Sequence, residues 1–179
     1  AMAPVPCLME ERASAAAIPE RQEGHVSATA IPERQEEPAT PGRVLDLCAA
    51  PGGKSTQIAE YMRGCGMLIT NEIHPQRAKI LSENIERMGI SNAIVLNETP
   101  ESLSKRFIAF FDRILVDAPC SGEGMFRKND NAGEEWSEEN VALCAERQDG
   151  ILDCAATMLK PGGRLVYSTC TFAPAEDEG

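Results

Sequence analysis

The sequence is poor in aromatic residues, with five Phe, two Tyr and one Trp among 179 residues. It contains no segment that resembles a signal peptide and no apolar run long enough to span a bilayer. We therefore expect a cytoplasmic protein with no membrane partner. Hydrophobic residues nevertheless make up 42% of the chain, so Leu, Ile, Val, Ala and Met can supply the core of a single domain.

Positive charge is also scarce. The chain has 28 acidic and 17 basic residues, a formal net charge of −11, whereas proteins that bind nucleic acids usually present a basic surface. Residues 43–179 alone hold 21 acidic and 14 basic residues, so the excess of acid is not confined to the N-terminal segment. If the chain acts on a nucleic acid, its phosphate contacts must come from a local patch or from parts outside this sequence.

The seven cysteines lack the pattern of a metal site or a disulfide framework. Their number is odd, no C-x-x-C pair occurs, and His25 and His74 do not have the spacing of metal ligands. We therefore expect no structural metal. Reduced thiols, some buried and one or two reactive, are the better interpretation.

Residues 1–42 differ in composition from the rest of the chain. Ser14–Val26 and Ser27–Ala39 are two copies of a 13-residue unit, and each copy contains A-I-P-E-R-Q-E. The unit has prolines and few large apolar residues, which is typical of a low-complexity insertion. Two polar copies are too few for a solenoid. We therefore expect the domain to occupy residues 43–179.

From residue 43 on, expected strands alternate with expected helices. The strands are predicted at Arg43–Cys48, Met67–Glu72, Asn92–Leu96, Asp112–Asp117 and Arg164–Ser168. The helices are predicted at about Gly53–Arg63, from Pro75, from Thr99 and from Ser137, the last one ending before Pro161. This alternation predicts an α/β fold, a doubly wound and mainly parallel sheet with helices on both faces.

The loop after the first expected strand reads C-A-A-P-G-G-K-S over residues 48–55. Its glycines let the backbone approach a ligand closely, and the following helix offers free N–H groups at its start. Glu72 comes nineteen residues after Gly53, at the end of the second expected strand, where an acid can bind the hydroxyls of a ribose. These features predict a nucleoside-bearing cofactor at the carboxyl ends of the strands.

A P-loop nucleotide triphosphatase is the main alternative for this loop. Gly53-Lys54-Ser55 imitates the end of the P-loop motif, and I-L-V-D at residues 114–117 imitates its acidic metal-binding strand. The motif needs a glycine where Cys48 stands, however, and Pro51 removes an N–H group from a loop that would cradle phosphates. A tight glycine turn without a ligand is the third interpretation.

Two cysteines follow two strands that would be neighbours in such a sheet. Asp117 and Cys120 come after the fourth strand, and Cys170 comes after the fifth. A thiolate that adds to C6 of cytosine makes C5 nucleophilic, and an acid can stabilise the charge that develops on the ring. A second thiol could assist release of the product. The target base must leave its stack, which favours single-stranded or loop RNA.

Three motifs in this order resemble those of the Sun-type RNA (cytosine-5-)-methyltransferases, particularly the bacterial 16S rRNA branch. They are V-L-D-L-C-A-A-P-G-G-K-S-T, V-D-A-P-C-S-G-E-G-M-F-R-K and G-R-L-V-Y-S-T-C-T-F-A-P. The resemblance covers Arg43 to the end, and A-M-A-P-V at the start is similar to a helix that precedes the cofactor strand in this family. It implies a Rossmann-like class I methyltransferase fold and S-adenosyl-L-methionine as the cofactor.

The resemblance also implies a role for each motif residue. Cys170 would attack C6, Cys120 would help to release the methylated product, and Asp117 would hold the cytosine near the cofactor. Glu72 would bind the ribose. DNA cytosine methyltransferases use the Pro-Cys thiol as the nucleophile, so the additional Cys170 favours RNA. The remaining cofactor residues would be Cys48, Ala49, Ala50, Pro51, Gly52, Gly53 and Lys54.

The sequence departs from the family's pattern in two respects. Asn97-Glu98-Thr99 stands where the family has an acid that contacts adenine, so Asn97 or Thr99 is expected to replace it. The family's N-terminal RNA-binding portion and the last two strands of its sheet are missing from this sequence. Arg127 and Lys128 are then the best local phosphate contacts, with ordinary solvated charges as the alternative. A fragment that binds S-adenosylmethionine or a partner without turnover is the competing functional hypothesis.

Overall fold

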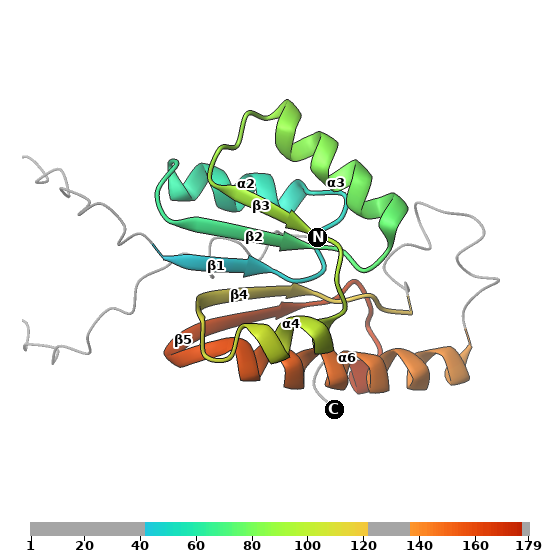
Figure 1. Ribbon diagram of the computed structural model, residues 1–179. Helices are drawn as coiled ribbons and strands as arrows, with labels where there is room; N and C mark the ends of the chain where they lie inside the picture. Colours follow the sequence, from blue (N-terminus) through green and yellow to red (C-terminus); the bar gives the residue numbers. More distant parts are fainter. Residues whose placement is uncertain (1–41, 122–136, 177–179) are drawn as a thin grey trace, which may run out of the picture.

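The computed structural model describes residues 42–121 and 137–176. They form a parallel sheet in the order β3-β2-β1-β4-β5 (Figure 1). The strands are β1 (Arg43–Asp46), β2 (Met67–Asn71), β3 (Ala93–Leu96), β4 (Phe111–Asp117) and β5 (Leu159–Ser168). The helices are α2 (Gly53–Met62), α3 (Pro75–Arg87), α4 (Pro100–Arg106), α6 (Glu138–Met158) and the short 3-10 helix η2 (Pro174–Glu176). The doubly wound, Rossmann-like α/β fold predicted from the sequence is confirmed.

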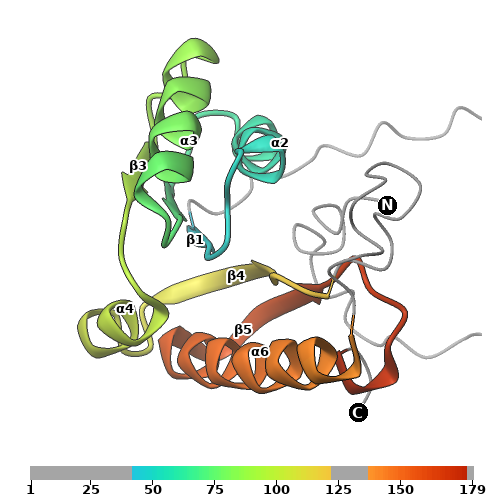
Figure 2. The same cartoon turned by 90° about the vertical axis from the view of Figure 1, so that its right-hand side faces the viewer.

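Helices cover both faces of the sheet, with α2 and α3 on one face and α4 and α6 on the other (Figure 2). Consecutive residues of each central strand serve opposite faces, because side chains alternate along a strand. Val44 therefore packs toward α2, while Leu45 packs toward α4 and α6. The cluster on the α2 face contains Val44, Ile58, Ala59, Met62, Leu68 and Leu115.

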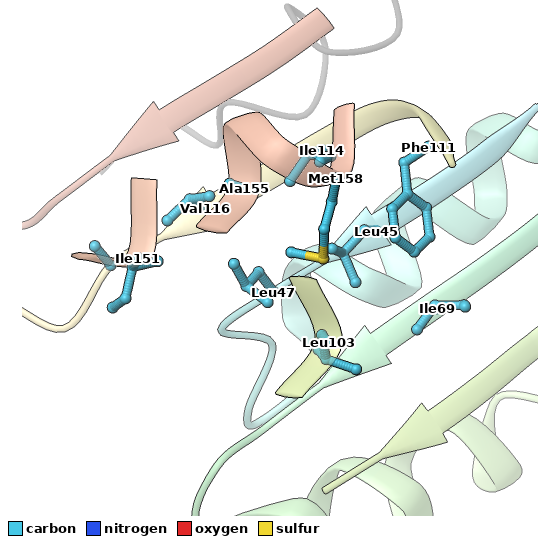
Figure 3. Close-up of a cluster of buried hydrophobic side chains, with 11 residues drawn as sticks. Leu45, Leu47, Ile69, Leu103, Phe111, Ile114, Val116, Ile151, Ala155 and Met158 are labelled. Carbon is cyan, nitrogen blue, oxygen red and sulfur yellow. The ribbon is translucent and has the colours of Figure 1, made fainter. Parts of the chain in front are cut away.

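The larger hydrophobic cluster lies between the sheet and helices α4 and α6 (Figure 3). Leu103 of α4, Met158 of α6 and Phe111 of β4 are all fully buried in it. The ring of Phe111 also packs on Phe107 and Phe110, with centroids 5.5 and 5.1 Å away. Three of the five phenylalanines thus gather at the start of β4 and anchor the amino end of the sheet, opposite the ends where ligands bind in this fold.

The predicted helix starts agree with the capping contacts. Ser137 precedes α6 and its hydroxyl oxygen accepts a hydrogen bond from Asn140 N at 3.1 Å. Thr99 caps α4 in the same way through Ser102 N at 3.2 Å, and Pro75 is the first residue of α3. Each cap satisfies an N–H group that has no partner inside its helix.

The last strand differs from the prediction, which placed its start at Arg164. β5 begins at Leu159, directly after α6, because Leu159 already pairs with Phe111. The register then shifts between Phe111 and Arg113. A Cβ atom at Gly163 would lie 2.9 Å from Asp112 O, so glycine permits this close approach. The Pro-Gly-Gly sequence therefore forms an irregularity within the strand rather than a separate turn.

Some predictions fall outside the described residues. The 13-residue repeat lies within residues 1–41, and Arg127 and Lys128 lie within residues 122–136. The structure does not describe either range. Among the helices of the described ranges, none combines the length and the apolar character needed to cross a bilayer.

Candidate active site

The predicted site residues lie at the carboxyl ends of all five strands of the sheet. The strand order reverses between β1 and β4, and in such a sheet the ligand crevice lies outside the carboxyl ends at this point. The loop after β1 supplies Cys48 to Lys54, Glu72 follows β2, and Asn97 and Thr99 follow β3. Asp117 ends β4, and Cys120 and Cys170 follow β4 and β5. The fold therefore brings these residues to one edge of the sheet.

Side chains of α3 hold the loop after β1. Arg77 donates to Ala50 O at 3.0 Å, and Asn84 donates to Pro51 O at 2.7 Å. Gly52 has a φ of 108°, and a Cβ atom there would lie 3.1 Å from Leu81 Cδ1. At Gly53, the first residue of α2, a Cβ atom would have no neighbour within 4 Å. The loop is therefore fixed on its α3 side and open at the start of α2.

Glu72 is a buried carboxylate at the end of β2, with 3% of its surface exposed. One oxygen accepts a hydrogen bond from His74 N at 3.0 Å, and the other lies 3.4 Å from the guanidinium of Arg77. Arg77 thus contacts both the loop after β1 and Glu72. This arrangement fixes the orientation of the acid that the sequence predicted for ribose binding.

Two asparagines connect the loops that surround Glu72. Asn71 donates to Leu47 O at 3.2 Å and to Glu98 O at 3.0 Å, and so links the ends of three strands. Asn97 donates to the carbonyl oxygens of Glu72 and Ile73 at 2.6 and 2.9 Å. Asn97 therefore lies against Glu72, whereas the Thr99 hydroxyl is engaged in capping α4. Asn71 was not identified from the sequence, because its role depends on backbone groups distant in the chain.

Asp46, at the end of β1, is a second buried acid that the sequence analysis did not select. Its side chain is fully buried, Oδ2 accepts a hydrogen bond from Ser55 at 2.7 Å, and Oδ1 has no partner among the described residues. Burial raises the pKa of Asp46 to about 7, opposed by the Ser55 hydrogen bond, with smaller effects from Asp117 and Lys54. The position of this acid between Leu45 and Leu47 was the available signal in the sequence.

Asp117 joins the loop after β1 to the ends of β4 and β5. The ammonium of Lys54 donates to Oδ2 of Asp117, and the hydroxyl of Ser168 donates to Oδ1 at 2.7 Å. Asp117 and Ser168 are directly paired in the register of the two strands. The carboxylate is thus oriented by one contact from each side of the crevice.

The two predicted thiols are in contact. Cys120 Sγ and Cys170 Sγ lie 2.8 Å apart as free cysteines. Partial burial of the sulfur raises the pKa of Cys170 to about 12, and the hydrogen bond and charge of Cys120 act in the same direction, as does Asp117. Cys170 therefore rests as a protonated thiol that must lose its proton before it can act as a nucleophile.

Three acids lie at the crevice, and basic side chains pair with two of them. The pKa of the Cys48 thiol is raised to about 12, chiefly by burial and then by the charges of Asp46, Glu72 and Asp117, against a lowering effect of Arg77, so all three acids act on one loop residue. Such a site favours a ligand that carries positive charge and disfavours a polyphosphate. Within residues 42–121 and 137–176, no three His, Cys, Asp or Glu side chains are grouped so as to hold a metal ion.

Comparisons with known proteins find a matching family and similar proteins. Residues 34–179 match a family model described as 16S rRNA methyltransferase RsmB/F. Ribosomal RNA small subunit methyltransferase F of Aeromonas salmonicida is 46% identical over 137 residues, 76% of this chain and 29% of the relative. The same-named protein of Shewanella denitrificans is 44% identical over 138 residues, 77% of this chain and 27% of the relative. The chain thus spans less than a third of these relatives.

A similar solved structure is that of NSun6 from Pyrococcus horikoshii with SFG. It has a TM-score of 0.70 and 34% sequence identity, over 77% of this chain and 35% of that chain.

Proposed function

The chain belongs to the 16S rRNA methyltransferase RsmB/F family, and on this basis we propose that it carries the catalytic domain, residues 43–179, of an enzyme that methylates C5 of cytosine in RNA. Ribosomal RNA is the expected substrate, since the relatives are named ribosomal RNA small subunit methyltransferase F. The observation that carries the proposal is the contact between Cys120 and Cys170 beside Asp117. A cytoplasmic location is proposed with it.

The crevice suits S-adenosyl-L-methionine. Asp46 Oδ1 is a buried acceptor without a partner among the described residues, and three carboxylates surround the loop after β1. These groups fit a ligand with an ammonium and a sulfonium. The NSun6 relative was solved with SFG, an analogue of this cofactor. When bound, S-adenosylmethionine supplies a methyl group on a positively charged sulfur.

We assign the cofactor contacts by position along the crevice. Residues 48–54 would surround the cofactor at the start of α2, and Glu72 would bind its ribose hydroxyls. Asn97 is better placed than Thr99 to meet the attached base, because Asn97 is bonded to the backbone of Glu72 and Ile73. Thr99 uses its hydroxyl oxygen in the cap of α4.

Cys170 is the proposed nucleophile. Its thiolate forms a bond to C6 of cytosine, and the electron pair of the C5–C6 double bond moves to make C5 nucleophilic. Asp117 would hold the base through N3 or the exocyclic amine, with Lys54 and Ser168 keeping the carboxylate in place. Lys54 also brings a positive charge to a ring that becomes electron-rich.

Cys120 is the proposed residue for product release. After methylation, the proton on C5 must leave and the bond between C6 and Cys170 must break, so that the double bond forms again. A thiol 2.8 Å from the nucleophile is close enough to assist both events. This division of roles gives each of the two cysteines a separate step.

The triphosphatase alternative is disfavoured by the charges of the site. A P-loop needs backbone N–H groups and a lysine that are free to meet phosphates. Here Lys54 is bonded to Asp117, and Asp46, Glu72 and Asp117 all act on Cys48 in the loop. The negative charge of these acids opposes the binding of a triphosphate.

RNA contact is proposed for Arg127 and Lys128, which lie outside the described residues. Because the crevice must admit a base that has left its stack, single-stranded or loop RNA is the expected form of the substrate. Replacing both residues with alanine should weaken RNA binding and leave cofactor binding unchanged.

The test uses labelled ribosomal RNA and S-adenosylmethionine with single cysteine variants. Cys120→Ala should accumulate a covalent protein–RNA complex that survives denaturation, because the adduct forms and is not released. Cys170→Ala should form no such complex and should transfer no methyl group. Cys65→Ala is the matched control, since this thiol lies in the turn between α2 and β2, at the other end of the sheet.

The outcomes separate the candidate functions. Methyl transfer by Cys170→Ala would show that the assigned roles are wrong. If the chain binds S-adenosylmethionine in calorimetry but forms neither adduct nor methylated RNA, it is a binding module. If it binds and hydrolyses ATP instead, the triphosphatase alternative is correct.

A further inference from the structure

Glu176, the last residue of η2, is buried beside the two thiol loops, with 2% of its surface exposed. Oε2 accepts a hydrogen bond from Ser121 N at 3.0 Å, directly after Cys120. Oε1 accepts one from the hydroxyl of Thr171 at 3.3 Å, directly after Cys170. One carboxylate thus receives a hydrogen bond from the neighbour of each thiol.

Gln148 of α6 donates a third hydrogen bond to Glu176. Its amide nitrogen donates to Glu176 Oε2 at 2.9 Å and to Pro119 O, just before Cys120, also at 2.9 Å. Both partners are acceptors, so the NH2 group must face them, and the amide oxygen is left buried without a partner among the described residues. These two hydrogen bonds therefore fix the orientation of the Gln148 amide.

The thiol loops also contact each other through hydroxyl groups. Ser121 Oγ and Thr171 Oγ1 lie 3.2 Å apart, so the residues that follow the two cysteines are in contact, as the cysteines themselves are. The backbone of Glu176 is held as well, because the hydroxyl of Tyr167 donates to Glu176 O at 2.9 Å. Glu176 is therefore hydrogen-bonded to β5, to α6 and to both thiol loops.

We propose that Glu176 is a positioning residue that sets the spacing of Cys120 and Cys170 by accepting hydrogen bonds from both thiol loops. The proposal rests on the proposed function only for its effect on the reaction; the spacing itself is a property of the free protein. Loss of the carboxylate removes the hydrogen bonds that Ser121 N and the Thr171 hydroxyl donate to it, so the two loops lose the acceptor that they share.

The consequence for the reaction follows from which loop is held more firmly. Cys170 follows β5 closely, where Ser168 is paired with Asp117, whereas Ser121 N is held through its hydrogen bond to Glu176. The Cys120 loop should therefore move more than the Cys170 loop when the carboxylate is removed. Adduct formation would persist while release slows, so that a Glu176 variant behaves like Cys120→Ala although both cysteines are present.

A side-chain amide can replace the carboxylate in this role. In Glu176→Gln, the amide oxygen can accept from Ser121 N and Gln148, and its NH2 group can donate to Thr171 Oγ1. Glu176→Ala can do neither. If positioning depends on hydrogen bonding, glutamine preserves the spacing and alanine does not; if the negative charge itself is needed, both variants fail alike.

The spacing can be measured without RNA or cofactor by reaction with phenylarsine oxide. Its arsenic forms bonds to two sulfur atoms with loss of water, so rapid bridging requires two adjacent thiols. Peptide mass spectrometry identifies bridging of Cys120 to Cys170, and Cys170→Ser gives the background from other cysteines. Glu60→Ala, an exposed residue of α2, is the matched control for loss of a carboxylate.

We expect bridging to slow by at least about tenfold in Glu176→Ala and by less than about twofold in Glu176→Gln and Glu60→Ala. Thermal unfolding reports stability separately. If Glu176→Ala does not fold, Gln148→Met, which keeps the side-chain volume and removes both donated bonds, should slow bridging instead. Native bridging rates in folded Glu176→Ala, or equally slow rates in the alanine and glutamine variants, would overturn the proposal.

The reaction provides a second, distinguishable readout. Incubation with ribosomal RNA should give an accumulated covalent complex in Glu176→Ala and little in Glu176→Gln. If bridging depends on Glu176 but no variant forms an adduct, the positioning role stands and the proposed methyl transfer fails. If adducts form in Cys120→Ala but the bridging rate is unchanged in the Glu176 variants, the function stands and the positioning role fails.

Discussion

The ammonium of Lys54 is bonded to the carboxylate of Asp117, and this contact joins two segments that are 63 residues apart in the chain. Lys54 follows β1 and Asp117 ends β4, on either side of the point where the strand order reverses. Both side chains remain partly exposed, so the pair lines the crevice rather than the core.

The first prediction concerns this pair. Lys54→Met should lower methyl transfer by about a hundredfold or more, because Asp117 loses the partner that orients it and the ring loses a nearby cation. The melting temperature should change little, since a partly exposed ion pair contributes about 1 kcal/mol or less. Single-turnover rates and thermal unfolding measure the two effects. Full activity in Lys54→Met would remove Lys54 from the proposed mechanism, and Lys79→Met on the surface of α3 is the control.

The second prediction concerns the stability of the fold as a function of pH. The pKa of Asp46 is raised from 3.8 to about 7, chiefly by burial, so the folded state holds a proton that the unfolded state has lost between these values. Asp46 should therefore support stability fully below about pH 4, and this contribution should be lost as the pH rises to about 7.

Asp46→Asn isolates this effect, because it keeps the size of the side chain and cannot titrate. The difference in unfolding free energy between Asp46→Asn and the native chain should grow in favour of the variant from pH 5 to pH 7.5. Denaturant titrations at these two pH values measure it. An equal difference at both pH values would mean that Asp46 does not titrate in this window.

The third prediction concerns the reactivity of Cys170. Burial of the sulfur is the largest cause that raises the pKa of this thiol, and the hydrogen bond and charge of Cys120 follow. Cys120→Ala removes two of these causes, so the pH midpoint of Cys170 alkylation by iodoacetamide should move downward. The midpoint, rather than the rate, is the quantity to compare, because the substitution also opens space. An unchanged midpoint would contradict the coupling of the two thiols, with Cys65→Ala as the control.

The fourth prediction compares two adjacent glycines. Gly52→Ala should destabilise the fold by about 1–3 kcal/mol, because φ is 108° and the new Cβ would lie 3.1 Å from Leu81 Cδ1. Gly53→Ala should cost little stability, since no atom lies within 4 Å of its Cβ position. It should instead weaken binding of S-adenosylmethionine, since the open space is part of the proposed cofactor site. Thermal unfolding and calorimetry separate the two effects, and a reversed order would contradict the assignment of that space.

Much of the fold could be predicted from the sequence because the signals are local. Apolar runs such as Ile114–Val116 mark buried strands, and caps such as Ser137 mark the starts of helices. The start of β5 was predicted wrongly because Pro161-Gly162-Gly163 is a strong local signal for a turn, and pairing of Leu159 with Phe111 outweighs it. Tertiary contacts decided that boundary.

The site was predictable only where one residue's chemistry is apparent by itself. The cysteines and Asp117 could be selected as reactive groups that follow strands. Glu176 could not, because its importance depends on Ser121 and Gln148, which are 55 and 28 residues away. Side chains that act by holding other side chains become visible only when the chain is folded.

The pairing of β4 with β5 limits how the loops beyond these strands can vary in length. Asp117 lies opposite Ser168 in the register of the two strands. Cys120 comes three residues after Asp117, and Cys170 comes two residues after Ser168. Inserting one residue into either connection would displace its sulfur by up to about 3.3 Å, more than the present separation of the two thiols. Substitutions near these cysteines can therefore be tolerated where an insertion or deletion cannot, and the number of residues is as much a part of the site as their identity.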